Sequence, residues 1–426
     1  MKKNRIFLCL ANPSGFEQQY IDAAFNEKWL APCGPNVDAF ERELEDFVNS
    51  SVELCHGIFP QKRVVAVSSG TAANHLALLA AGVEKDDEVL VQSFCFIACA
   101  NPVMYCGAKP VFIDSEPLTW NMSPQFLEEA IIDRKKKTGR YPKAIMLVDL
   151  FGMPAMLDEI VAVAEKYNVV LIEDAANAFG SKYKGRMCGT FGRLGTLSFN
   201  GNKMITTSGG GALITNNEEE WREVMMYATQ YRESYPYYHH EKIGYNYRMS
   251  NICAGIGRGQ MTVVNDHIAH HRHVQNLYEE LLQDVQGITV HSQPDTGEYE
   301  SNYWLCTITL DPELRVIGQE DAYKTIIKNA VGGAAGVIHV ADSATTDCQP
   351  NDNVEAMRVA LDKAGIEARP LWKPMHKQPV YQGCPAYVNG ISEAMFKVGM
   401  CLPSGPCVSD DDVRYIVENI KNAIVK

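Results

Sequence analysis

The sequence predicts an α/β fold in which helices cover both faces of a mostly parallel central sheet, followed by a smaller C-terminal α+β domain. From residue 63 onward, short runs rich in Val, Ile and Leu alternate with longer helical segments. Strands that are apolar along their whole length are typical of a parallel sheet buried on both faces. The 426 residues also exceed the roughly 250 to 300 at which a single core stops growing. We therefore expect a large domain over residues 1–260 and a small domain over residues 261–426.

The expected elements of the large domain follow one another along the chain. Strand, helix, strand, helix and strand are predicted in turn for RVVAVSS (63–69), GTAANHLALLAAG (70–82), DEVLVQS (87–93), FIACANPVMYCG (96–107) and KPVFID (109–114). A second series of strand, helix and strand is predicted for AIMLVDL (144–150), PAMLDEIVAVAEKY (154–167) and NVVLIEDAA (168–176). Apolar residues recur at helical spacing in the middle segment of that series, whereas the last is a nearly continuous apolar strand that ends in an acid.

The chain changes character past about residue 260. Residues 263–285 predict a long, charged helix, and strand-like YWLCTITLD (303–311) comes after it. The segment 328–353 is rich in Gly, Ala, Ser and Asp, which indicates an insertion or a mobile loop.

Composition excludes several classes of protein. A hydrophobic fraction of 46% and a charged fraction of 21% are ordinary for a globular protein, and no apolar run is long enough to span a bilayer. The net charge of -13 comes without a Lys/Arg block, so we expect neither a nucleic-acid partner nor a membrane partner. The 13 cysteines are scattered singly, which favours reduced thiols and a cytoplasmic location over a disulfide framework.

Polar residues gather where the predicted strands end. Gly70 and Thr71 form a strand-to-helix turn, whose free N–H groups suit a phosphate, although such a turn is also an ordinary helix cap. Asp174 ends a strand too apolar to lie in water, so its carboxylate needs a partner. Ser198 ends another predicted strand, and Lys203 lies in the Gly/Thr-rich turn after it. Because ligands of parallel sheets bind at the carboxyl ends of the strands, one pocket could collect these groups.

Together these groups point to one cofactor. A phosphate turn, an acid for a cationic ring nitrogen and a lysine for a covalent bond are the parts needed to hold pyridoxal 5'-phosphate. A single lysine is usually only solvated, so the prediction rests on the three features together.

Other residue patterns give weaker evidence for a binding site. His267, His270 and His271 have helical spacing that could bind zinc, but we predict a solvated helix face, and no metal site. The glycine runs at 255–260 and 331–336 lack the order expected of a dinucleotide loop, and no P-loop motif occurs.

Seven motifs carry a family resemblance over essentially the whole chain. They are WLAPCGPNVDAFE, VSSGTAANHLAL, SFCFIACANPVMYCGAKPVFID, LIEDAANAFGS, GTLSFNGNKMITTSGGG, IGYNYRMSNICAGIGRGQM and RPLWKPMH. In this order the motifs resemble those of the DegT/DnrJ/EryC1/StrS sugar aminotransferases, a branch of the fold-type I pyridoxal phosphate enzymes. Within that family the chain looks most like enzymes that act on UDP-4-keto-6-deoxy-N-acetylhexosamines.

The resemblance implies a set of cofactor contacts. They are Gly70, Thr71, Phe96, Asp174, Asn177, Ser198, Lys203, Asn246 and Arg248. In the roles that the family implies, Lys203 and Asp174 are catalytic, Lys203 as covalent anchor and Asp174 at the ring nitrogen. Phe96, which the residues alone would assign to the core, is implied to stack on the ring. Asn246 and Arg248 are implied to reach the cofactor phosphate of a neighbouring subunit, which makes the protein a homodimer with shared sites.

The resemblance also implies substrate contacts and departs from the family in places. Substrate contacts fall at Trp372, Lys373 and His376. Asn177 stands where the family commonly has His, Gln or Glu near the ring hydroxyl, and the segment 328–353 is longer than the resemblance leads us to expect.

The implied reaction moves an amino group from L-glutamate to the C4 ketone of a nucleotide-linked 4-keto-6-deoxy sugar for surface glycan biosynthesis. Pyridoxamine 5'-phosphate is the intermediate form of the cofactor. The alternatives are C3 amination of a 3-keto nucleotide sugar, a pyridoxal phosphate-dependent sugar dehydratase, an NAD-dependent sugar oxidoreductase and a non-catalytic regulator. The dehydratases of the family replace the lysine by histidine, a regulator would lose the lysine or the acid, and an oxidoreductase would need a nucleotide fingerprint.

Overall fold

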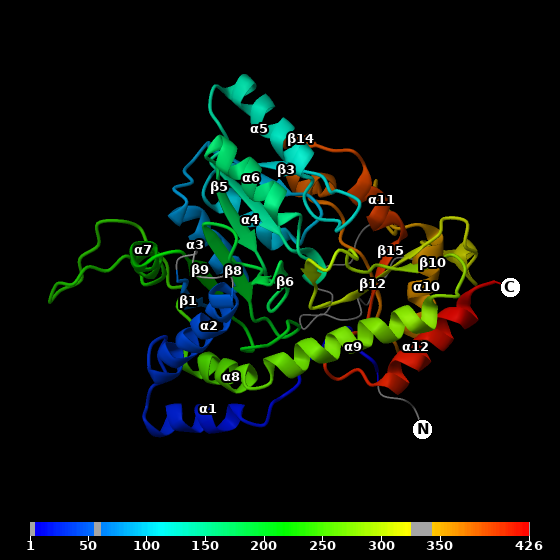
Figure 1. The fold of residues 1–426 in the computed structure, drawn as a ribbon, viewed down its shortest axis with the longest axis horizontal. Helices are drawn as coiled ribbons and strands as arrows, with labels where there is room; N and C mark the ends of the chain where they lie inside the picture. Colours follow the sequence, from blue (N-terminus) through cyan, green and yellow to red (C-terminus); the bar gives the residue numbers. More distant parts are fainter. Residues whose placement is uncertain (1–4, 55–60, 325–342, 426) are drawn as a thin grey trace.

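The computed structural model describes residues 5–54, 61–324 and 343–425. Its centre is an eight-stranded sheet in the order β1-β9-β8-β5-β4-β2-β3-β14 (Figure 1). The strands are β1 (Arg63–Val67), β2 (Glu88–Gln92), β3 (Lys109–Ile113), β4 (Ala144–Val148), β5 (Val170–Asp174), β8 (Leu194–Ser198), β9 (Gly211–Thr215) and β14 (Ala386–Tyr387). All run in one direction except β9, which is antiparallel to both neighbours.

Each face of this sheet is covered by helices, which explains why its strands are apolar throughout. Alternate residues of a strand point to opposite faces: Ile145 and Leu147 of β4 join one core, and Met146 joins the other. The first core includes residues of α2 (Pro35–Leu54), α5 (Pro124–Thr138) and α6 (Leu157–Tyr167). The second includes residues of α3 (Gly70–Ala80), α4 (Asn101–Tyr105) and α7 (Glu218–Ala228). The predicted α/β architecture is confirmed.

The C-terminal part forms a second layer of helices on a small sheet. Its antiparallel strands are β10 (Ile288–Val290), β12 (Cys306–Leu310), β15 (Gly399–Leu402) and β13 (Arg369–Pro370). The helices with residues in its core are α9 (Val264–Leu282), α10 (Asp352–Lys363) and α12 (Asp410–Ala423). Figure 1 shows α9 running from α8 (Asn251–Met261) beneath the large sheet to α12 at the far end.

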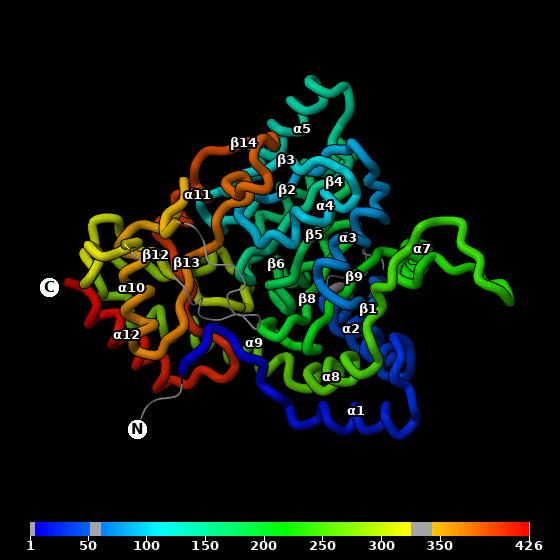
Figure 2. Tube along the Cα trace, turned by 180° about the vertical axis from the view of Figure 1, so that it is seen from behind, coloured from blue at the N-terminus to red at the C-terminus, as the bar shows by residue number. Residues whose placement is uncertain are grey.

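The division after residue 260 stays a prediction. It falls at the end of α8, but segments from both ends of the chain cross it: β14 adds to the large sheet, and Ile6 bridges Ile366 within the small part. Figure 2 shows the N-terminal segment, in blue, lying against the C-terminal part. Of the predicted segment 328–353, residues 328–342 lie outside the described part, and α10 begins at Asp352.

The remaining short elements complete the chain. They are α1 (Glu17–Asn26), α11 (Ile391–Val398), β6 (Lys182–Tyr183), β7 (Arg186–Met187), β11 (Tyr299–Glu300) and the 3-10 helices η1 (Ile97–Cys99), η2 (Leu150–Gly152), η3 (Gln319–Asp321), η4 (Met375–Lys377) and η5 (Pro379–Tyr381). Within the described ranges, no helix combines the length and the apolar character needed to cross a membrane.

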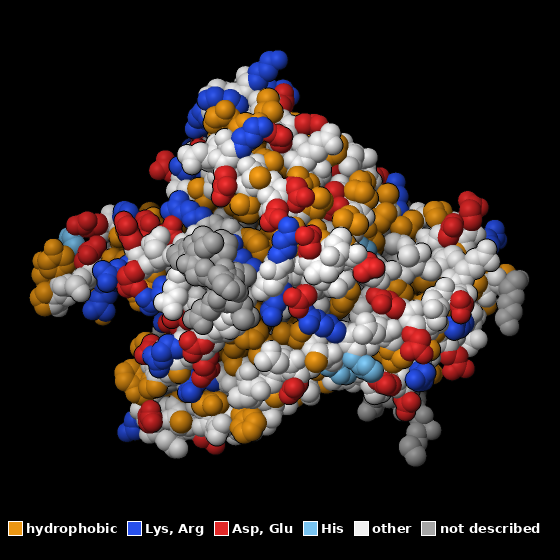
Figure 3. All heavy atoms as spheres, in the orientation of Figure 1, with side chains coloured by type: hydrophobic (Ala, Val, Ile, Leu, Met, Phe, Trp, Pro, Cys, Tyr) orange, Lys and Arg blue, Asp and Glu red, His pale blue; other side chains and the backbone are white. Residues whose placement is uncertain are grey.

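An arm formed by residues 229–246 projects from the body beside α7 (Figures 1 and 2). Backbone bridges join Thr229 to Asn246 and Arg232 to His240, so its two sides run antiparallel. Its outer part carries exposed Tyr237 and Tyr238, and Figure 3 shows apolar side chains gathered at its end. Elsewhere on that face, basic and acidic side chains are interspersed, so the net charge of -13 is not concentrated there.

Candidate active site

The predicted rim residues do meet at one edge of the large sheet. Strands β1, β2, β5 and β8 run in parallel, so their carboxyl ends carry the Gly70 turn, Ser93, Asp174 and Ser198 at the same edge. The approach is close, since a Cβ on Gly70 would lie 2.9 Å from the Cβ of Ser198. A larger residue at position 70 would therefore push the start of α3 away from β8.

The start of α3 offers unused donors. Ser69 caps the helix by accepting a hydrogen bond from the Ala72 N–H, which is 3.0 Å away. The N–H groups of Gly70 and Thr71 and the hydroxyl of Ser198 have no hydrogen-bond partner within the described residues. Together with the positive end of the helix dipole, they can bind an anionic group such as a phosphate.

Lys203 lies beside this edge, between the two parts of the chain. Its Nζ donates to Oδ1 of Asn177 at 2.6 Å and lies 3.9 Å from the centre of the Trp304 ring. Burial lowers the pKa of the lysine to about 8, although the negative charge of Asp174 opposes that change. The amine is therefore neutral far more often than an ordinary lysine at neutral pH, and a neutral amine is a nucleophile and a base.

Asp174 is buried at the end of β5 and is held in a fixed orientation. Its Oδ1 accepts from the Ala176 N–H at 2.9 Å, and its Oδ2 accepts from the amide of Asn74 at 2.8 Å. The structure thus supplies an oriented carboxylate near the lysine, which suits a cationic partner.

Three residues of this region were missed by sequence reasoning. Asn302 donates through Nδ2 to the carbonyls of Asn177 and Phe179, each at 3.0 Å, and Trp304 forms a wall beside Lys203. Asn74 lies in the helix predicted for residues 70–82, but no role was predicted for it. For Asn302 the available signal was an amide shortly before the strand at 306–310, because a polar group next to a buried strand requires partners.

An aromatic wall lies beside these groups. The Trp372 ring is 5.8 Å from Phe96, 4.8 Å from Phe151 and 6.2 Å from Trp304. Phe96 is 56% exposed, so the core assignment made from its apolar neighbours is wrong. An exposed aromatic ring at the rim has a face free to stack on a planar ligand.

The other predicted substrate residues differ in their surroundings. His376 lies with its Nδ1 2.6 Å from the hydroxyl of Ser93, and burial lowers the pKa of the imidazole. Lys373 forms an ion pair with Asp347 at 3.1 Å. The structure thus brings Trp372 and His376 to the rim, whereas the Lys373 ammonium is paired.

Asn246 and Arg248 line a hollow of about 660 Å³ beside the arm, which Lys203 does not line, and the backbone of Arg248 bridges Val67 at the end of β1. Arg248 is already paired within its own chain, with Glu41 and with the Ala66 carbonyl at 3.1 Å, and its side chain is only 9% exposed. Asn246 is exposed, and within the described residues its side chain has no hydrogen-bond partner. A phosphate contact from Arg248 would therefore have to compete with Glu41.

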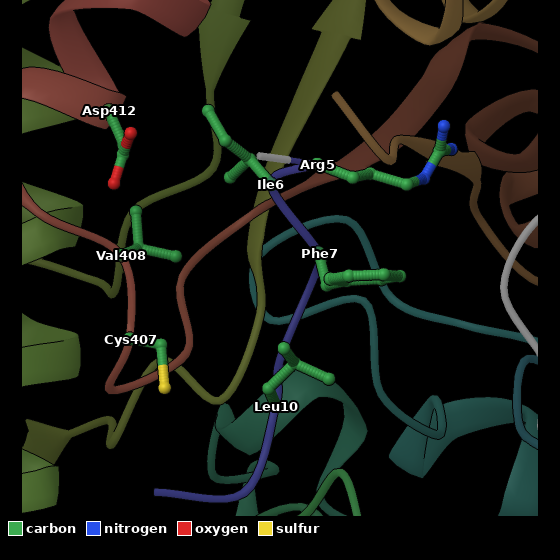
Figure 4. A pocket seen from close by; sticks show the side chains of 7 residues that line it. All are labelled: Arg5, Ile6, Phe7, Leu10, Cys407, Val408 and Asp412. Carbon is green, nitrogen blue, oxygen red and sulfur yellow. The ribbon is translucent and has the colours of Figure 1, made fainter. Parts of the chain in front are cut away.

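A second pocket, of about 350 Å³, lies between the N-terminal segment and the loop before α12, where the side chains of Ile6, Leu10, Cys407 and Val408 surround it (Figure 4). None of the predicted site residues lines it.

The predicted solvated face of α9 is wrong. His267 and His271 are buried, and their Nδ1 atoms lie 3.0 Å from the Met204 carbonyl and 3.1 Å from the Tyr303 carbonyl. The helix is enclosed because it spans both parts of the chain.

One group of possible metal ligands, Asp149, Glu173 and Cys188, is found within the described residues. Glu173 accepts three backbone N–H bonds from residues 189, 191 and 192. Burial and the nearby Glu173 raise the pKa of Asp149 well above its ordinary value.

The residues at the rim fit pyridoxal 5'-phosphate on their own chemistry. Unpaired N–H groups and a hydroxyl match the phosphate, the Asp174 carboxylate matches a protonated ring nitrogen, and Lys203 matches the aldehyde.

Comparison with known proteins agrees with this class of enzyme. The fold matches a DegT DnrJ EryC1 StrS aminotransferase from Brucella abortus with a TM-score of 0.79 and 26% identity, over 97% of this chain and 96% of the other. The chain belongs to the DegT/DnrJ/EryC1/StrS aminotransferase family, whose sequence model matches residues 13–339 and 334–421. The predicted fold type, cofactor and aminotransferase class are confirmed: this is a pyridoxal phosphate-dependent sugar aminotransferase.

Two relatives cover almost the whole chain. EpsN of Bacillus subtilis (strain 168), provisionally named a pyridoxal phosphate-dependent aminotransferase, is 41% identical over 97% of this chain and 94% of its own length. GDP-perosamine synthase of Escherichia coli O157:H7 is 33% identical over 96% of this chain and 95% of its own length. A third relative, UDP-2-acetamido-2-deoxy-3-oxo-D-glucuronate aminotransferase of Pseudomonas aeruginosa, is 34% identical over 59% of this chain and 65% of its own length.

Proposed function

We propose that the protein transfers the amino group of L-glutamate to the C4 ketone of a nucleotide-linked 4-keto-6-deoxy sugar, and that this sugar is a UDP-linked N-acetylhexosamine. The proposal is carried by the buried amine of Lys203, whose pKa is lowered to about 8 and which lies near the carboxylate of Asp174 at the end of β5. Relatives named for GDP- and UDP-linked sugars support a nucleotide-sugar substrate.

The chain's own groups divide the work of the reaction. Bound pyridoxal 5'-phosphate supplies an aldehyde that takes up an amino group and a ring that withdraws electrons from the adjacent carbon. Lys203 holds the cofactor covalently at rest. Once displaced by the donor, its neutral Nζ takes the proton from the α-carbon of glutamate, and in the second half-reaction it delivers a proton to C4 of the sugar.

The other rim groups bind and orient. Asp174 holds the proton on the ring nitrogen, and the N–H groups at the start of α3 bind the phosphate with Ser198. Asn177, which accepts a hydrogen bond from Lys203 at 2.6 Å, keeps the amine aimed at the reacting carbon. Phe96 stacks on the ring.

We assign the sugar side of the pocket to Trp372 and His376, with Lys373 near the nucleotide phosphates if it leaves Asp347. Trp372 offers an aromatic face for the sugar or base, and the pair of Ser93 and His376 offers polar atoms 2.6 Å apart for a sugar hydroxyl.

We further propose a homodimer in which the arm reaches a neighbouring subunit, with Asn246 as its contact to the partner's cofactor phosphate. Its exposed amide is available for that contact, whereas Arg248 is paired with Glu41. The exposed tyrosines Tyr237 and Tyr238 on the arm are of the kind enriched at protein interfaces.

A GDP-linked 4-keto sugar is the second candidate substrate. Three GDP-perosamine synthases are 33%, 32% and 30% identical over nearly the whole chain, whereas one relative named for a UDP-linked sugar matches only 59% of it.

The test uses purified protein loaded with pyridoxal 5'-phosphate. Borohydride should bleach the yellow protein and fix the cofactor on the lysine that binds it. Cofactor found on the peptide that contains Lys203 supports the role of this residue as covalent anchor. The loaded protein is then incubated with glutamate and paired UDP- and GDP-linked 4-keto sugars, and the amine position is assigned by NMR. Amination at C3, or no turnover of any 4-keto sugar, would contradict the proposal.

A further inference from the structure

The carboxylate of Asp174 is surrounded by hydrogen-bond donors from two segments far away in the sequence. Asn74, on α3, donates through Nδ2 to Oδ2 at 2.8 Å. Cys99, in the short helix after β2, donates through Sγ to the same oxygen at 3.2 Å. Both residues are buried, so water does not compete for these bonds.

The Asn74 amide has little freedom to turn. Its Oδ1 accepts from the hydroxyl of Thr196 at 2.6 Å, and its Nδ2 also lies 3.1 Å from the Ala98 carbonyl. A flipped amide would place its NH2 group against that hydroxyl and its oxygen against the carboxylate and the carbonyl. Because the Ala98 carbonyl and the carboxylate can only accept, they fix the Asn74 NH2 group as their donor.

Cys99 is a donor for a different reason. A hydrogen bond with Cys95, burial and the negative charge of Asp174 raise the pKa of the Cys99 thiol well above its ordinary value. The thiol therefore keeps its proton, and the 3.2 Å between its Sγ and Oδ2 lets it donate to the carboxylate.

These contacts leave one oxygen with spare capacity. Oδ2 receives two donors, whereas Oδ1 receives only the Ala176 N–H at 2.9 Å. A carboxylate oxygen has about two lone-pair sites, so Oδ1 can accept one more bond. We propose that Asn74 and Cys99 are positioning residues that hold Asp174 with Oδ1 toward the cofactor ring and limit how strongly the carboxylate attracts the ring proton. This rests on the proposed role of Asp174.

The consequence is electronic as well as geometric. Donors to a carboxylate stabilise its charge and make it a weaker base. If a donor is lost, Asp174 attracts the ring proton more strongly, the ring withdraws fewer electrons, and the cofactor's bond to Lys203 keeps its proton to higher pH. The bond between Lys203 and the cofactor has four other titratable groups around it. They are the Asp174 carboxyl group and the thiols of Cys9, Cys95 and Cys99, and all three thiols lie outside the strands of the large sheet.

The test measures absorbance of the loaded protein against pH. In Asn74→Leu and Cys99→Ala, the midpoint of the colour change should rise by about one pH unit, because one hydrogen bond to a charged group is lost. Cys99→Ser keeps a donor and should stay close to wild type. Asn353→Leu is the matched control, since Asn353 is a buried helical asparagine that bonds the carbonyls of Asp311 and Leu314 in the small part.

Two results would separate the possible failures. Midpoints of Asn74→Leu and Cys99→Ala that match wild type would overturn the inference, and if Asn74→Leu does not fold, the Cys99 pair alone decides. A wild-type protein that binds the cofactor without a borohydride-fixed bond to Lys203 would instead contradict the proposed function.

Discussion

The lowered pKa of Lys203 makes a prediction about stability that needs neither cofactor nor substrate. In the unfolded chain the amine has an ordinary pKa of about 10.5, whereas in the folded protein burial lowers it to about 8. Between these values the unfolded state binds more protons than the folded state. The free energy of unfolding of the apoprotein should therefore rise with pH across this window through Lys203.

The size of this change in the free energy of unfolding follows from the pKa shift of Lys203. A difference of about 2.5 pH units, at about 1.4 kcal/mol per unit, gives about 3 kcal/mol between pH 7.5 and 10.5. Lys203→Met removes this contribution and keeps a side chain of similar length. The gap in stability between wild type and Lys203→Met should thus change by about 3 kcal/mol over the window, in favour of wild type at high pH.

Urea unfolding of both apoproteins at several pH values measures this gap. Every other titrating group is shared, so the effect of each group that does not interact with Lys203 cancels in the difference. Lys136→Met, at an exposed position on α5, is the control and should run parallel to wild type. Parallel curves for wild type and Lys203→Met would refute the buried, neutral amine. If the shift is found, about a quarter of the amine is neutral at pH 7.5, against about a thousandth for an ordinary lysine.

Three further outcomes are expected. Asp174→Asn should fold and lower turnover by more than about a hundredfold, because a neutral amide cannot hold the ring proton. Turnover within about threefold of wild type would contradict the role assigned to Asp174. Arg248→Ala should lower the free energy of unfolding by about 3 kcal/mol or more, because it leaves the buried Glu41 carboxylate without its partner. Thermal unfolding measures this, and an unchanged melting temperature would contradict the pairing. Asn246→Ala should keep wild-type stability but lose cofactor affinity, and mixed with inactive Lys203→Ala it should regain activity through heterodimers with one intact site. No recovery in well-exchanged mixtures would refute the shared site.

The sequence predicted the strand ends correctly because local pattern determines them. Apolar strands followed by small polar residues lead Asp174 and Ser198 to the same edge, whatever the details of packing. Asn74 could not be found in this way. It is 100 residues from Asp174, and only the packing of α3 against the sheet brings the two together. The histidines of α9 were misjudged for a related reason: a polar residue on a charged helix indicates solvent only if nothing covers that face.

The position of the reacting amine depends on both parts of the chain. The residues on either side of Lys203 are bonded through their carbonyls to the C-terminal part, Asn202 to Trp304 Nε1 at 2.6 Å and Met204 to His267 Nδ1 at 3.0 Å. Any shift of α9 or of the strand that follows Trp304 would pull on this turn directly. A turn held only by its own strand would let a flexible lysine sample many positions, whereas these two bonds hold its backbone near Asn177. The C-terminal part therefore helps to place the Lys203 turn, and with it the amine that the proposed reaction uses.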